Sequence, residues 1–105
     1  MKILVLWKVK PDADMSVIGD LLLDEERFAW KMFLDDELRE HYASDLPAPA
    51  ISILEMESIE AAKAKLEDLP INKAGLLEPE YYPLRPFDNW EVLFRDDEKV
   101  AHKNA

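Results

Sequence analysis

Cysteine is absent from the 105 residues of this chain. Without it the chain can form no disulfide, no thiolate nucleophile and no zinc-thiolate site, a composition typical of a reducing compartment. Positive charge is also scarce, because 13 lysines and arginines stand against 23 aspartates and glutamates, a formal net charge of −10. Such a chain repels a phosphate backbone and an anionic membrane surface, so we expect neither nucleic acid nor a membrane as a partner.

Long hydrophobic runs are missing as well, since no run approaches the roughly 18 residues that a membrane-spanning helix requires. The opening MKILVLWKVK returns to lysine after a short apolar run, and no small-residue cleavage site follows it. We therefore interpret it as a strand and expect a cytoplasmic protein. Hydrophobic residues make up 49% of the chain and charged residues 34%, which predicts one globular domain with a core.

Periodicity divides the chain into strands and helices. Residues 2–9 are apolar on both faces, which indicates a central strand. A helix is expected from about Asp14 or Ser16 to about Leu34, followed by strands within 35–44 and at 50–56. Ser58 is expected to cap a second helix that ends before Pro70. The prolines of residues 76–86 are typical of an edge strand.

This order of strand, helix, strand, strand, helix, strand predicts an α+β protein of the ferredoxin-like βαββαβ type, an antiparallel sheet with both helices on one face. The other face of the sheet would be left open, although the first strand is apolar there too. We therefore expect two chains to pack together into a homodimer or a higher homo-oligomer. Residues 1–86 form this domain, and residues 87–105 follow as an aromatic arm, FDNWEVLF at 87–94, and a polar tail. The arm is expected to pack across a neighbouring subunit.

The first helix carries an acid within its apolar stripe. On a helical wheel of about 100° per residue, six apolar residues gather on one side: Ile18, Leu21, Leu22, Phe28, Ala29 and Met32. Glu25 falls in the middle of that stripe, whereas its neighbours Asp24 and Glu26 fall outside the centre and reach water. A carboxylate held among apolar side chains loses hydration, which raises its pKa and makes it a plausible general base near neutral pH. Leu23 and Trp30 lie opposite the stripe, where an apolar surface predicts a partner.

Three stretches resemble the muconolactone isomerase family, over about residues 18–86: DEERFAWKMFLDDELREHYAS, ISILEMESIEAAKAKLEDLPI and the closing LRP. The resemblance implies the ferredoxin-like fold assembled as a dimeric α+β barrel. It also implies a cofactor-independent proton shift that moves a double bond in an unsaturated lactone. The family's helix acid corresponds to Glu25 and its second-strand arginine to Arg39. Glu40 and Arg85 stand where the family has histidine.

The predicted catalytic site therefore contains Glu25, Arg39 and His41, with a small molecule as substrate. Glu25 would move the proton, and Arg39 would stabilise the enolate or clamp a substrate carboxylate. Alternation along the second strand places His41 on the same face as Arg39. No cofactor is implied, and His41 with Asp45 lacks the further ligands of a metal site.

Each of these residues also has a non-catalytic interpretation. Glu25 could pair with a strand arginine or lysine or reach water. Arg39 could pair with Glu37 or Asp36 on the surface, and His41 could simply be a hydrogen-bonded or exposed histidine. Three functions therefore stay open: an isomerase-like enzyme, a non-catalytic binding or assembly module of the same fold, and a cofactor-free monooxygenase or cyclase of the dimeric α+β barrel group.

Overall fold

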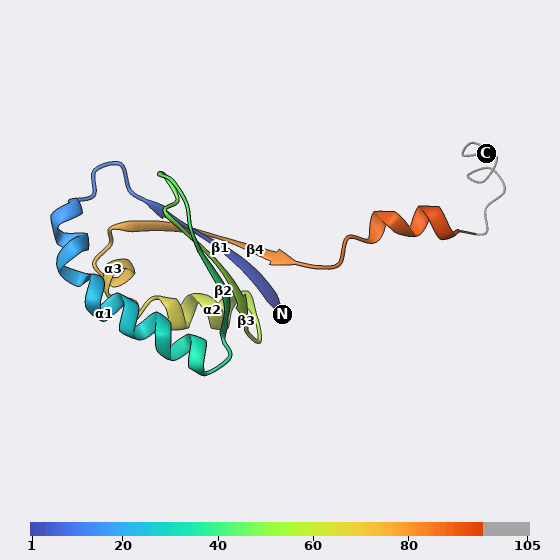
Figure 1. The fold of residues 1–105 in the computed structure, drawn as a ribbon, viewed down its shortest axis with the longest axis horizontal. Coiled ribbons are helices and arrows are strands. Elements are labelled where there is room, and N and C mark those ends of the chain that lie inside the picture. The colour runs from blue at the N-terminus through green and yellow to red at the C-terminus, as the bar shows by residue number, and fades with distance from the viewer. Residues whose placement is uncertain (96–105) are drawn as a thin grey trace.

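The structure, a computed structural model, describes residues 1–95. The predicted polar tail lies, from residue 96 on, outside the described residues. Before it the chain forms, in order (Figure 1), β1 (Lys2–Val9), α1 (Met15–Leu34), β2 (Leu38–Ala43), β3 (Ala50–Glu55), α2 (Ile59–Leu66), α3 (Pro70–Lys73), β4 (Leu77–Leu84) and the 3-10 helix η1 (Asp88–Phe94).

The four strands form one antiparallel sheet in the order β2-β3-β1-β4, and the helices lie on one of its faces (Figure 1). The strands that α1 joins, β1 and β2, are separated by β3, and those joined through α2 and α3 are separated by β1. These are the two interlocked split βαβ units of the ferredoxin-like fold. The predicted α+β class, the central position of β1 and the edge position of β4 are confirmed.

The core lies between the sheet and the helices. Alternate residues of β1, Ile3, Val5 and Trp7, point into it and are buried. Leu54 of β3 and Leu66 of α2 are buried beside them. Because one face of the sheet and one face of each helix supply these side chains, the space between the two layers is also where a ligand cavity can form.

The predicted caps hold the two longer helices. Asp14 accepts a hydrogen bond of 2.9 Å from the backbone N–H of Ser16, so α1 begins at Met15. Ser58 accepts one of 3.0 Å from the N–H of Ala61 and caps α2. The sequence did not predict α3, which Pro70 opens at its first position. This short helix carries the backbone group that contacts Glu25.

The face of the sheet away from the helices has no cover within residues 1–95 and carries a central apolar cluster bordered by Lys8, Glu40 and Glu80. It carries six large apolar or aromatic side chains at the paired inner positions of the strands: Leu4, Leu6, Tyr42, Ile51, Ile53 and Tyr82. The four aliphatic ones are only half-buried and both tyrosines are exposed. An apolar sheet face of this kind is typical of an interface between chains.

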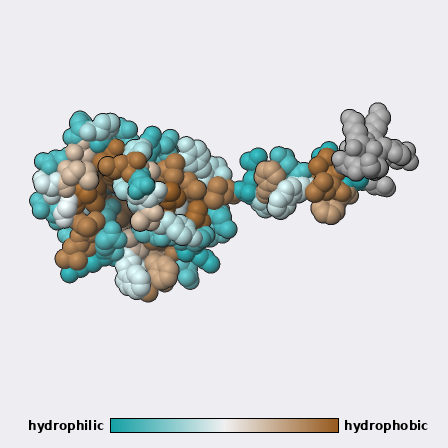
Figure 2. Space-filling view, turned by 45° about the horizontal axis from the view of Figure 1, so that its top comes forward, coloured by the Kyte–Doolittle hydropathy of each residue, from teal (hydrophilic) through white to brown (hydrophobic). Residues whose placement is uncertain are grey.

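The aromatic arm leaves the body beyond the end of β4 and projects from it (Figure 1), so that the molecule extends 61 Å along its longest axis. Its Phe87 and Trp90 rings contact each other edge to face, with centroids 5.7 Å apart. Trp90 is 68% exposed and Phe94 84%. Hydrophobic side chains therefore reach the surface of both the body and the arm (Figure 2). None of the helices in the described part of the chain is both long and apolar enough to cross a membrane.

Candidate functional site

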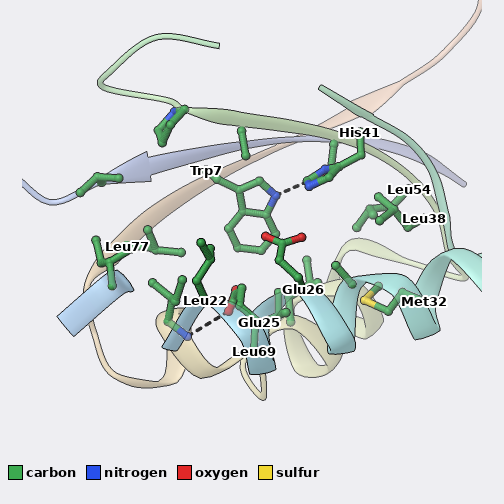
Figure 3. Close-up of a pocket in the computed structure, with 18 of the residues that line it drawn as sticks. Trp7, Leu22, Glu25, Glu26, Met32, Leu38, His41, Leu54, Leu69 and Leu77 are labelled. Carbon is green, nitrogen blue, oxygen red and sulfur yellow. Dashed lines mark hydrogen bonds between the residues drawn. The ribbon is translucent and has the colours of Figure 1, made fainter. Parts of the chain in front are cut away.

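A cavity of about 330 Å³ lies between the sheet and the helices. Its walls come from α1 and from all four strands. Leu66 of α2, Ile71 of α3 and Leu69 between these two helices complete them. Most of the lining is aliphatic. The side chains that bring polar atoms to it include Trp7, Glu25, Glu26 and His41 (Figure 3). Ser52 of β3 is a further one. A pocket of this size with a few convergent polar groups is the usual form of a small-molecule site.

Glu25 lies where the helical wheel predicts it, with only 9% of its surface exposed. Its Oε2 accepts a hydrogen bond of 3.0 Å from the backbone N–H of Ile71, at the start of α3 (Figure 3). It forms no ion pair with any of the described residues, so the pairing with a strand arginine or lysine is not seen there. Glu25 is therefore a carboxylate enclosed by apolar side chains with one neutral hydrogen-bond donor.

Burial raises the pKa of Glu25 above its ordinary value, because the charged form loses its hydration. The hydrogen bond from Ile71 opposes this, and the neighbouring negative charge of Glu26 adds to it. The balance is a carboxylate that binds a proton more readily than a free glutamate. Such an acid takes up and releases a proton at a higher pH than a free glutamate, which suits a general base.

Glu26 lines the same cavity, although it is exposed and was expected only to reach water. Its carboxylate points from α1 towards the sheet, in the direction of Trp7 and His41 (Figure 3). Glu26 and His41 also line a neighbouring groove whose aromatic wall is Trp30 stacked on Phe33, with centroids 5.2 Å apart. The cavity and this groove therefore adjoin between α1 and β2.

His41 is the end of a short chain of hydrogen bonds across three strands. Trp7 Nε1 donates to Ser52 Oγ at 2.8 Å, and Ser52 Oγ lies 2.8 Å from His41 Nδ1. An indole N–H only donates, so the one hydroxyl proton of Ser52 is free to be donated to Nδ1. With the bond in that direction, a neutral His41 carries its own proton on Nε2, where it can meet a ligand.

Arg39 is not brought to Glu25. A bulge interrupts β2, so that Leu38 pairs with Leu54 while Glu40 pairs with Ile53. The expected strict alternation is therefore wrong at this point, since Leu38 and His41 both line the cavity and the extra residue Arg39 does not. Arg39 is exposed, and among residues 1–95 it forms no ion pair with Glu37 or Asp36.

Sequence reasoning missed the contributions of Trp7, Ser52 and Glu26 to this site. Ser52 could have been found, because it occupies an inward position of β3 between apolar neighbours, and a buried hydroxyl needs a hydrogen-bond partner. The part of the chain that the structure describes holds no cluster of three or more acidic or histidine side chains placed to bind a metal.

Comparisons define the class of fold. No family model and no curated protein matches the chain. Among solved structures, 5-chloro-2-hydroxyhydroquinone dehydrochlorinase (TftG) from Burkholderia phenoliruptrix AC1100, in complex with 2,5-dihydroxybenzoquinone, is similar with a TM-score of 0.69. The alignment covers 81% of this chain and 94% of that chain at 17% identity. This similarity supports the ferredoxin-like fold, and at 17% identity it shows the fold alone.

Proposed function

We propose that this protein is a small-molecule enzyme that catalyses a cofactor-independent proton shift, moving a C=C bond in an unsaturated lactone or a related carbonyl compound. The observation that carries the proposal is Glu25, a carboxylate of raised pKa enclosed by the apolar cavity. A similar scaffold holds a ring compound in the dehydrochlorinase structure, which was solved with 2,5-dihydroxybenzoquinone. This agrees with a small-molecule substrate.

The proton moves through one carboxylate. Glu25 takes a proton from the carbon beside the carbonyl group, and the electrons of the broken C–H bond pass into the conjugated system as an enolate. The neutral acid then returns the proton at the far conjugated carbon, which moves the double bond and restores the carboxylate. The N–H of Ile71 holds one carboxylate oxygen in place and leaves the other available to the substrate.

The enolate oxygen needs a hydrogen-bond donor, and we assign this role to His41, which lines the cavity. When Ser52 donates to Nδ1, the Nε2–H of a neutral His41 is free for the substrate, and a neutral donor stabilises developing charge without needing to be protonated first. Arg39, predicted for this task, has no part in the proposal because it does not line the cavity.

The test is proton exchange in deuterium oxide. A panel of unsaturated lactones and enones is incubated with the natural protein, and deuterium uptake at the two conjugated carbons is followed by NMR. Uptake faster than in buffer supports the proposal. If the protein binds members of the panel without any exchange, it is instead the non-catalytic binding module of the same fold.

The hydrogen-bond chain predicts a definite tautomer of His41. In the natural protein, nitrogen NMR at a pH where the ring is neutral should place the proton on Nε2. Ser52→Ala should remove this preference and slow exchange by about tenfold, since one hydrogen bond to the transition state is weakened. Ser52→Thr keeps the hydroxyl, so it is expected to retain both the Nε2 tautomer and the exchange rate of the natural protein. The chain has only two histidines, so His102→Gln completes the assignment. A proton found on Nδ1 in the natural protein would contradict this arrangement.

We further propose that the chain is a homodimer or a higher homo-oligomer. The open apolar face of the sheet favours packing against a second copy. The arm favours a further contact, because its large apolar side chains are exposed on its own chain. Contact between the arm and a neighbouring subunit stays a prediction.

A further inference from the structure

The charge of the cavity lining is entirely negative among the described residues. Glu25 and Glu26 both line it, and no lysine or arginine among residues 1–95 does so. The basic residues of α1 are engaged elsewhere, since Arg27 forms an exposed ion pair with Asp24 at 3.5 Å and Lys31 with Asp35 at 3.1 Å. A ligand that enters this cavity therefore meets two carboxylates and no cation of the described chain.

This charge decides which ligands can enter. A ligand carboxylate would lose its hydration among apolar walls with no positive partner, which is strongly unfavourable. The carboxylate of Glu26 would repel it, and so would the net charge of −10 on the whole chain. A neutral carbonyl compound has no charge to desolvate, and neither Glu26 nor the net charge of the chain repels it.

The remaining features describe the shape of an acceptable ligand. A volume of about 330 Å³ is roughly twice that of a cavity that holds one benzene ring, about 150 Å³. One or two rings therefore fit between the aliphatic walls and the indole of Trp7. The Nε2–H of His41 can donate to a carbonyl oxygen, and the carboxylate of Glu26 can accept from a ligand hydroxyl.

We propose that the cavity selects an uncharged one- or two-ring carbonyl compound and rejects carboxylates, with Glu26 as the residue that sets this specificity. The carbonyl group in this inference rests on the proposed function, whereas the rejection of anions follows from the lining alone. Substrates that carry a free carboxylate are thereby excluded, including those that Arg39 was expected to clamp.

Matched ligands test this directly. An unsaturated lactone bearing a carboxylic acid and its methyl ester differ mainly in charge, and their dissociation constants are measured by calorimetry at pH 7 with the full chain. The ester should bind at least tenfold more tightly than the acid. Glu26→Gln should reduce that ratio several-fold, because it removes the repelling charge and keeps the shape. Glu60→Gln, on the exposed side of α2, should leave the ratio unchanged.

The outcomes separate this inference from the proposed function. Acid bound as tightly as ester, or neither ligand bound across a panel of one- and two-ring lactones, would overturn the inference. A ratio that Glu26→Gln does not change would overturn the role of Glu26. Preferential binding of the ester without proton exchange would overturn the proposed function and leave the selection standing. Exchange of the acid at the same rate as the ester would overturn the selection against carboxylates and leave the proposed function standing.

Discussion

Glu25→Gln is expected to abolish proton exchange while the free energy of unfolding at pH 7 stays the same or rises. Removal of a general base costs about 10²- to 10⁴-fold in rate. Glutamine has the same shape, and its side-chain oxygen can still accept the hydrogen bond from Ile71. Exchange rates and urea unfolding of the two proteins provide the measurement.

The expected stability follows from the direction of the pKa shift. Because folding raises the pKa of Glu25, its contribution to stability is complete below the unfolded pKa and is lost as the pH rises through the folded pKa. At pH 7 the ionised carboxylate therefore weakens the fold, and glutamine removes that penalty. A buried carboxylate kept for its chemistry behaves in this way, whereas one that stabilises the fold does not.

Asp24→Asn is the matched control, since Asp24 precedes Glu25 on α1 and lies on its exposed side. Exchange and stability should both remain close to those of the natural protein, because exposed ion pairs contribute little. A Glu25→Gln variant that exchanges normally would remove this residue from the mechanism. One that loses much of its unfolding free energy would show that the carboxylate is structural.

Ile53→Lys is expected to convert the proposed homo-oligomer to a monomer. Ile53 lies on the open face of the sheet, where Leu4 and Glu40 are its register partners on the two neighbouring strands. In a packed interface the lysine ammonium would lose its hydration, and pairing with Glu40 would offset only part of that cost, whereas in a monomer it would reach water, so the fold survives and the assembly does not. Sedimentation at micromolar concentration measures the mass, and circular dichroism confirms the fold.

Two further variants show which surface forms the interface. Val17→Lys introduces the same charge on the exposed part of α1, away from the open sheet face, and should leave the mass unchanged. A chain that ends after Pro86 lacks the arm, and its mass shows whether the arm or the sheet face joins the subunits. If Ile53→Lys keeps the full oligomeric mass, the open face of the sheet is not the interface.

Sequence patterns were sufficient for the features that depend on local periodicity. The position of Glu25 follows from the 3.6-residue repeat of α1, and the caps Asp14 and Ser58 mark where the two longer helices begin. The order of the elements then leaves few topologies, which is why the ferredoxin-like fold could be predicted from one sequence.

Features that depend on long-range contacts or on single inserted residues were missed. The four residues of α3 are too few to show helical periodicity, so the hydrogen bond from the Ile71 N–H to Glu25 could not be predicted. The bulge in β2 adds one residue and reverses the inward and outward positions after it, so that His41 lines the cavity together with Leu38 while Arg39 does not. Trp7 and Ser52 are 45 residues apart, and only the pairing of β1 with β3 brings them together.

The most direct measurement is the titration of Glu25 itself, followed by carbon NMR of side-chain carboxyl groups, with Glu25→Gln to assign its signal. The account predicts a pKa clearly above the ordinary glutamate value of 4.5, and an exchange rate that rises with pH through the same transition. A pKa at or below that ordinary value would contradict the claim that a desolvated carboxylate is the base of this site.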